Sequence, residues 1–117
     1  MPNSYPVLDL VFHAMADPAR RNIVERLSRG PASVSELAEP LLMSLPSVLQ
    51  HVAVLETSGL VRSEKVGRTR TCRLDTKQLQ AAESWISARR MSWERRLDRL
   101  GAYLVNTDPH KPKRKRS

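Results

Sequence analysis

The chain has 117 residues, 40% of them hydrophobic and only 4% aromatic, which allows one domain with an aliphatic core. A net charge of +8 favours an anionic polymer as partner, the alternative being a basic protein whose charge only keeps it soluble. The single cysteine excludes a disulfide within the chain, and the sequence shows neither a signal peptide nor an apolar run of membrane-spanning length, so we expect a soluble cytoplasmic protein.

Two helices are predicted over residues 8–30. The first has apolar residues at helical spacing: Leu8, Val11, Phe12 and Met15. Asp17 then precedes Pro18, the pattern of an N-cap followed by proline at the first helical position. The second helix is expected to stop at Gly30.

Two further helices are predicted, with a short turn between them. Ser33 and Glu36 form a capping box that opens a short helix, and Ser44 caps the next one. The residues of the latter that we expect to face the core are Leu45, Val48, Leu49, Val52 and Leu55. Its other face shows Ser47, Gln50, His51 and Val54.

After Gly59 the pattern predicts a β-hairpin, with two β-prone runs around the "KVGR" turn that contains Gly67. A long helix follows from about Thr76 to Leu104. Its apolar stripe comprises Leu79, Ala82, Ile86, Trp93, Leu97, Leu100 and Leu104, with Trp85 beside it. Residues 106–117 hold five basic residues and one acid, so this tail carries +4 and the body the other +4. We expect a domain over residues 5–105 and a disordered basic tail over 106–117.

This order of elements predicts a mainly α fold with a small β-hairpin, a winged helix-turn-helix whose second motif helix enters the major groove of DNA. The segments "VFHAMADPARRNIVERLSRGPASVSELAE" and "MSLPSVLQHVAVLETSGLVRSEKVGRTRTCRLD" resemble the ArsR family of winged-helix repressors, over roughly Leu8 to Leu104. The resemblance implies a homodimeric transcription repressor that pairs through its first and last helices. Two-fold symmetry then predicts a palindromic operator in double-stranded DNA.

The segment from Met43 to Val61 has one ionised side chain, Glu56, and is flanked by cations. A neutral helix with short polar side chains suits close approach to base edges, and Gln50 can bind adenine through two hydrogen bonds. Cations around the hairpin turn are placed to meet phosphates. The candidate DNA-binding residues are Ser44, Pro46, Ser47, Gln50, His51, Lys65, Arg68 and Arg70. For His51, phosphate contact and a structural hydrogen bond remain equal alternatives.

Two positions depart from the pattern of the family. Leu49 stands where a small polar residue is frequent, and its spacing predicts that it enlarges the core. Ala53 stands where the family often has a basic residue, and alanine cannot make the phosphate contact of that residue. We therefore do not transfer the DNA specificity of related proteins to this chain. For Arg20 and Arg21, at the start of a helix, a salt bridge to a carboxylate is expected ahead of a phosphate contact.

The long helix has more apolar residues than one small domain needs, which favours a dimer seam over packing within one chain. The predicted interface residues are Leu8, Val11 and Phe12 of the first helix with Trp85, Trp93 and Leu97 of the last.

Neither a metal site nor a cofactor is expected, because the helix before the predicted DNA-reading helix has no cysteine and the last helix has no histidine. Cys72 is expected to be a buried hydrophobic residue rather than a redox switch. No catalytic constellation or phosphate-binding loop is present in the sequence, so an enzyme is not expected, and an effector could be a small molecule or a protein. Two alternatives remain: a winged-helix module that binds another protein, and an architectural DNA binder led by the tail.

Overall fold

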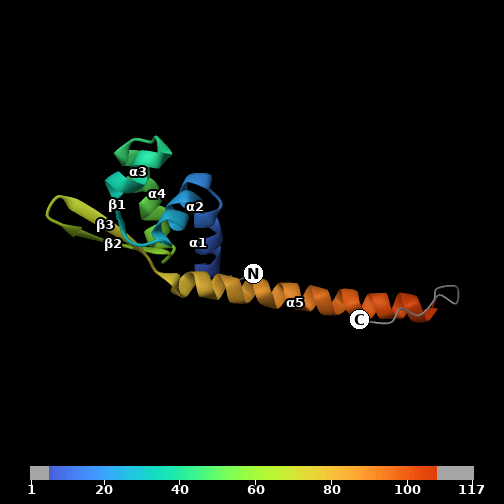
Figure 1. The fold of residues 1–117 in the computed structure, drawn as a ribbon. Coiled ribbons are helices and arrows are strands. Elements are labelled where there is room, and N and C mark those ends of the chain that lie inside the picture. Colours follow the sequence, from blue (N-terminus) through green and yellow to red (C-terminus); the bar gives the residue numbers. More distant parts are fainter. Residues whose placement is uncertain (1–5, 108–117) are drawn as a thin grey trace. The chain divides into compact units, whose positions relative to one another are not determined.

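The computed structural model describes residues 6–107, which form five helices and three strands (Figure 1). In chain order these are α1 (Pro6–Met15), α2 (Pro18–Leu27), β1 (Ala32–Ser33), α3 (Val34–Leu41), α4 (Leu45–Thr57), β2 (Val61–Val66), β3 (Thr69–Leu74) and α5 (Thr76–Thr107). The chain divides into two compact units, one ending at Ala82 and the other beginning at Glu83, within α5. The predicted fold class, mainly helical with a small β-hairpin, is confirmed.

The helices of the first unit begin where the sequence places capping residues. Asp17 accepts hydrogen bonds from the backbone N–H groups of Ala19 and Arg20 at 2.8 and 3.3 Å. Ser33 and Glu36 form the complete capping box, with both reciprocal bonds at 3.1 Å. Each cap satisfies N–H groups that have no partner inside the helix, so local chemistry sets these helix starts.

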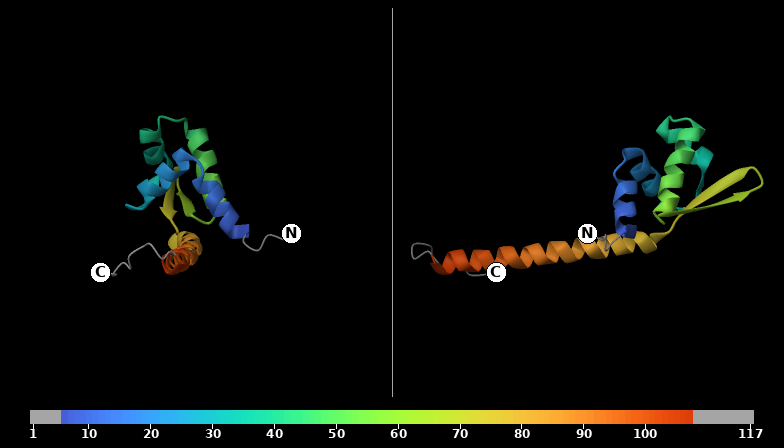
Figure 2. Two further views of the ribbon diagram at one scale, coloured as in Figure 1. Left: turned by 90° about the vertical axis from the view of Figure 1, so that its right-hand side faces the viewer. Right: turned by 180° about the vertical axis from the view of Figure 1, so that it is seen from behind.

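The sheet has the strand order β1-β3-β2 and is antiparallel throughout. The hairpin matches the expected one, and Val66 pairs with Thr69, which leaves Gly67 and Arg68 as a two-residue loop. Gly67 has a φ of +63°, a conformation that glycine adopts without steric cost. The two-residue strand β1 was not predicted. The hairpin projects beyond the helices of this unit (Figures 1 and 2) and forms the wing.

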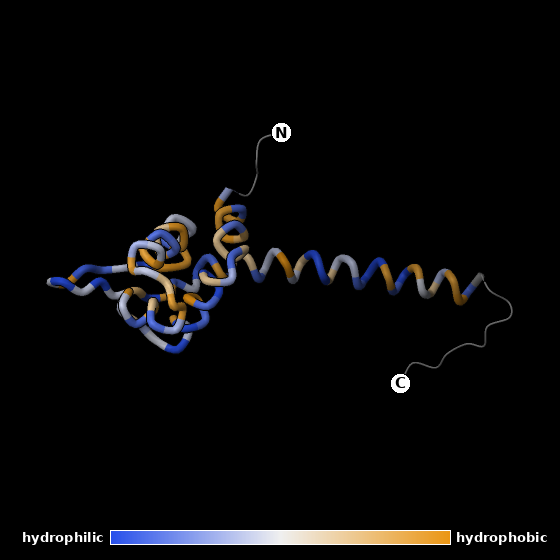
Figure 3. The backbone as a smooth tube through the Cα atoms, turned by 90° about the horizontal axis from the view of Figure 1, so that it is seen from above, coloured by the Kyte–Doolittle hydropathy of each residue, from blue (hydrophilic) through white to orange (hydrophobic). Residues whose placement is uncertain are grey.

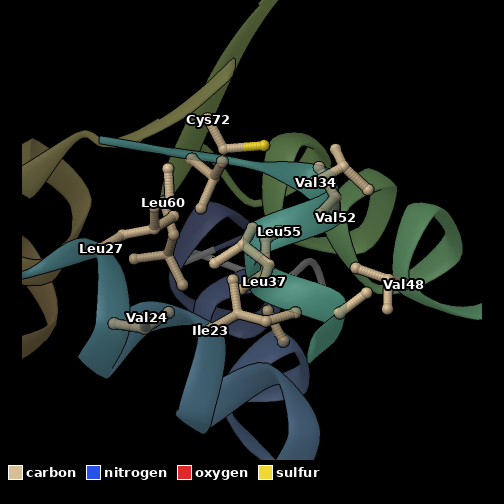
Figure 4. Close-up of a cluster of buried hydrophobic side chains, with 14 of the residues drawn as sticks. Ile23, Val24, Leu27, Val34, Leu37, Val48, Val52, Leu55, Leu60 and Cys72 are labelled. Atoms are coloured by element: carbon tan, nitrogen blue, oxygen red, sulfur yellow. The ribbon is translucent and has the colours of Figure 1, made fainter. Parts of the chain in front are cut away.

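The core of the first unit lies between the helices and the sheet (Figure 4). Val48, Val52 and Leu55 project from one face of α4 into this core and are almost fully buried. They meet side chains from α2, α3, the sheet and the turn before β2, of which the largest fully buried ones are Ile23, Leu37, Leu60, Val61 and Cys72. Burial of a leucine or valine side chain stabilises the fold by about 1.5–3 kcal/mol. One face of α4 is therefore held firmly while its opposite face is exposed.

α3 and α4 form the helix-turn-helix, with a bend of 112° between them at the break after Leu41. Such an angle is typical of the motif. Leu42 ends α3 in the left-handed conformation, with φ 55° and ψ 34°. Within residues 6–107 no single helix is long and apolar enough to cross a membrane; α3 and α4 reach that length and apolar composition only when the bent pair is taken together.

The second unit consists of α5 from Glu83 onward. The helix runs to Thr107, three residues beyond the predicted end, so Asn106 and Thr107 belong to the helix rather than to the tail. The rest of the predicted disordered tail, residues 108–117, lies outside the described residues. Hydrophobic and hydrophilic positions alternate along this helix (Figure 3), and the hydrophobic ones are largely exposed in the single chain.

Candidate nucleic-acid interface

The exposed surface of α4 divides into three lines of residues, because successive residues rotate by about 100° around a helix. Opposite the buried stripe lie Pro46 and Gln50, both exposed. Ser47 and His51 form a half-buried line on one side. Leu45 and Leu49 form the line on the other side, toward the wing. Apart from the two leucines, this is the polar face that the sequence predicts.

The polar residues at the start of α4 are held in place by one another. Ser44 caps the helix by accepting the backbone N–H of Ser47 at 3.4 Å, and its hydroxyl donates to Ser47 Oγ at 3.0 Å. A serine hydroxyl has one donor, so Ser47 keeps its own O–H for another acceptor. Gln50 is exposed, and its side-chain amide forms no hydrogen bond within residues 6–107. The amide therefore presents both a donor and an acceptor to a ligand of α4.

His51 makes a structural hydrogen bond, one of the two roles left open by the sequence. Its Nδ1 lies 3.3 Å from Nη1 of Arg20. A guanidinium has only donors, so Nδ1 is the acceptor, and the neutral ring carries its hydrogen on Nε2. The bond thus fixes the tautomer and leaves Nε2–H as a donor. Arg20 also lies 3.9 Å from a carboxylate oxygen of Asp17, the predicted salt bridge, although its shorter contacts are to backbone carbonyls of α1.

Lys65 and Arg68 lie on the exposed part of the wing and form no salt bridge within the part of the chain that the structure describes. Arg70 differs, because its Nη1 donates to Ser63 Oγ at 2.8 Å. Ser63 Oγ in turn donates to Glu56 Oε1 at 2.8 Å. Ser63 thereby joins the hairpin to Glu56, the one acidic side chain of α4, and Arg70 braces the wing by holding Ser63 in place. Sequence reasoning did not detect this brace.

A groove of about 610 Å³ lies between the start of α3, α4 and the wing. We call it the helix–wing groove; it is lined by Ser33, Val34, Ser35, Leu45, Leu49, Lys65, Arg68, Thr69 and Arg70. The prediction that Leu45 and Leu49 face the core is wrong, since they are 48% and 43% exposed in this groove. Leu49 is seven residues before Glu56, so both lie on one line of the helix, and the charge of Glu56 already indicated that this line is exposed.

Cys72 is fully buried in the core, as predicted, and its burial raises the pKa of its thiol. Its neighbours Glu56 and Arg70 act on that pKa in opposite directions, and the carboxylate of Glu56 adds to the rise. Among residues 6–107, no three His, Cys, Asp or Glu side chains gather in a way that could hold a metal ion.

The predicted dimer residues lie in different environments. The structure corrects the prediction that Val11 belongs to the dimer interface. Val11 is only 2% exposed, in the core of its own unit, and is not available to a partner. Leu8 is half-buried against the same core, whereas Phe12 is exposed. Trp93 and Leu97 are 62% and 57% exposed. Within the second unit, Trp85 carries the guanidinium of Arg89 over its ring at 5.2 Å.

Comparison with known proteins places the chain in a family. A model described as "Helix-turn-helix domain" matches residues 15–64. The HTH-type transcriptional regulator Rv2034 of Mycobacterium tuberculosis is 44% identical over 79 residues, 68% of this chain and 74% of the relative. A crystal structure of an ArsR family transcriptional regulator, RHA00566, is 46% identical, covers 80% of this chain and 97% of its own, and superposes with a TM-score of 0.74.

The chain belongs to the ArsR family. A further relative, the transcriptional repressor SdpR of Bacillus subtilis, is 30% identical over 76 residues, 65% of this chain and 84% of that protein. Membership in the ArsR family makes the protein a DNA-binding transcriptional regulator rather than an enzyme. α4 is the second helix of this helix-turn-helix, the position that the recognition helix takes in such motifs.

Proposed function

We propose that the protein is a homodimeric repressor that binds a palindromic operator through α4 and the wing of each subunit. The observation that carries the proposal is the arrangement around α4, where a face without ionised side chains lies beside the cations of the wing. A polar neutral face approaches base edges closely, while flanking cations neutralise phosphates. The relative SdpR is named a transcriptional repressor, which supports repression rather than activation.

In this proposal each subunit inserts α4 into the major groove. Gln50 and Ser47 bind base edges, and Ser44 and Pro46 approach the same bases from the first turn of the helix. His51 donates through Nε2 to a phosphate, because Arg20 holds its ring by Nδ1. Lys65 and Arg68 bind the DNA backbone, with Arg70 both bracing the wing and adding positive charge.

The dimer is proposed to form through α5, aided by Phe12 of α1. Trp93, Leu97 and Leu100 are spaced by four and three residues, which places them on one side of the helix, and all three are exposed in the single chain. A contiguous exposed apolar surface is typical of an interface between subunits. A two-fold axis then sets two recognition helices about one helical turn of DNA apart, or a multiple of it.

The test is selection of bound duplexes from a random library with the full chain, followed by footprinting and by sedimentation. We expect a dimer and an inverted repeat. Trp93→Glu should yield monomers that lose operator affinity, and Ala102→Glu, exposed on the same helix outside the Trp93–Leu97–Leu100 line, controls for the added charge. A monomeric wild type without preference among duplexes would overturn the proposal.

Deletion of residues 106–117 separates the proposal from an architectural role led by the basic tail. Operator preference should survive the deletion, with a shallower dependence of affinity on salt because fewer phosphates are neutralised. Loss of all binding would favour the architectural role, and retention of a protein partner without DNA binding would favour a protein-interaction module.

A further inference from the structure

Leu45 and Leu49 form an apolar pair on a surface that is otherwise polar and basic. Their side chains are 48% and 43% exposed, and a spacing of four residues makes them neighbours on α4. Both line the helix–wing groove, whose opposite wall includes Lys65 and Arg68. The pair is therefore neither core nor an ordinary solvated edge of the helix.

The charge of the groove restricts what can cover this pair. Two cations that form no salt bridge within residues 6–107 favour an anionic occupant, while the leucines require that it also offers an apolar group. Duplex DNA meets both conditions, because thymine alone among the bases carries a methyl group, at C5, on the edge that faces the major groove. Its phosphates supply the negative charge next to that edge.

We infer that Leu49, supported by Leu45, contacts the C5-methyl group of a thymine next to the base that Gln50 binds. The inference rests on the proposed function and names a specificity determinant within it. Leu49 and Gln50 are consecutive, so they lie about 100° apart on the helix and reach neighbouring positions along the groove. Leu45 lies one turn nearer the N-terminus of α4, the end at which recognition helices meet base edges.

The experiment replaces the thymines of the selected operator, one position at a time, by deoxyuridine, which lacks only the methyl group. The full-length protein is titrated against each duplex at one salt concentration. Removing the contacted methyl should lower affinity about fourfold at one position in each half-site, the effect of exposing one buried methyl group. Deoxyuridine at the other thymines should leave affinity unchanged.

Leu49→Ala then completes a double-mutant cycle. The variant should bind the thymine operator more weakly and should no longer distinguish thymine from deoxyuridine at that position. Leu49→Met, which keeps an apolar side chain of similar reach, should retain most of the discrimination. Leu42→Ala is the matched control, since it removes an exposed leucine from the turn outside the groove and should leave the discrimination intact.

The outcomes separate this inference from the function on which it rests. A wild-type protein that selects an operator but responds to no deoxyuridine substitution would overturn the methyl contact and leave the proposed function standing. Persistence of the thymine preference in Leu49→Ala would assign the contact to another residue and also overturn it. Absence of any sequence preference in the wild type would overturn the proposed function itself and the inference with it.

Discussion

Nη1 of Arg20 lies 3.3 Å from Nδ1 of His51, and this contact joins α2 to α4. The same guanidinium donates from Nε to the carbonyl of Ala14 at 2.7 Å and from Nη2 to that of His13 at 3.1 Å. Both carbonyls belong to the last turn of α1, and that of His13 also accepts the backbone N–H of Ala16 at 3.2 Å. One largely buried side chain, 12% exposed, therefore connects three helices.

Arg20→Met is expected to lower the free energy of unfolding by about 1–3 kcal/mol, because it removes charge-assisted bonds to the end of α1. Urea denaturation measures the change. Arg21→Met is the control, since Arg21 is exposed and donates one such bond, at 2.8 Å to the carbonyl of Met15. Equal losses in the two variants would show that the contact to His51 and the second carbonyl adds no stability.

Gln50→Ala should weaken operator binding by about 1–3 kcal/mol and relax the preference at one base position, the effect of losing a bidentate contact to a base. Selection of bound DNA with the variant, alongside the wild type, measures both changes. An unchanged base preference would remove Gln50 from the DNA interface.

Arg68→Ala should weaken binding to all duplexes by a similar factor and reduce the slope of log affinity against log salt by about one, as expected for a phosphate contact. Titrations of operator and random duplexes at several salt concentrations provide the measurement. Arg62→Ala is a suitable comparison, because Arg62 pairs with Asp75 at 2.8 Å and lies outside the helix–wing groove. If Arg68→Ala lost affinity at a single base pair only, the residue would be a base contact instead.

Leu42→Gly should raise the free energy of unfolding by about 0.5–1 kcal/mol. Leu42 occupies the left-handed region at the end of α3, where a Cβ atom is unfavourable and glycine is not. Its side chain is 94% exposed, so little packing is lost. Thermal or urea denaturation tests this expectation, and Leu42→Ala, which retains the Cβ atom, should show no gain.

Asp17→Asn should alter how stability depends on pH. Partial burial opposes ionisation of Asp17, but hydrogen bonds from the N–H groups of Arg20 and Ala19, together with the charges of His51 and Arg20, outweigh it and hold the pKa below its ordinary value of 3.8. The ionised carboxylate therefore stabilises the folded state above the unfolded pKa, and this contribution is lost as the pH falls through the folded pKa. Asparagine keeps the cap but does not titrate.

The difference in free energy of unfolding between the wild type and Asp17→Asn should consequently shrink when the pH is lowered through the range of the Asp17 pKa. Urea denaturation at a series of acidic pH values measures it. A difference that stays constant across the series would show that the charge of Asp17 contributes nothing beyond its role as a cap.

Some corrections concern residues whose partners are distant in sequence. β1 is only two residues long, and its pairing of Ala32 with Cys72 depends on the hairpin, so no local pattern indicates it. Helical spacing places Leu49 in the core, because spacing alone does not locate the margins of the buried stripe. Val11 fits both a core and a dimer seam by spacing, and only the packing of α1 in the first unit distinguishes them.

Interactions within a few residues determine the helix starts at Asp17, Ser33 and Ser44, the turn at Gly67 and the basic hairpin. The sequence by itself therefore predicts these features correctly. Other features depend on elements that meet only after folding. These are the hydrogen bond between Glu56 and Ser63, the contact of Arg20 with His51, and the exposure of Leu49. Capping and turn chemistry act over three or four positions, whereas side-chain partners across elements are chosen by the packing of the whole unit.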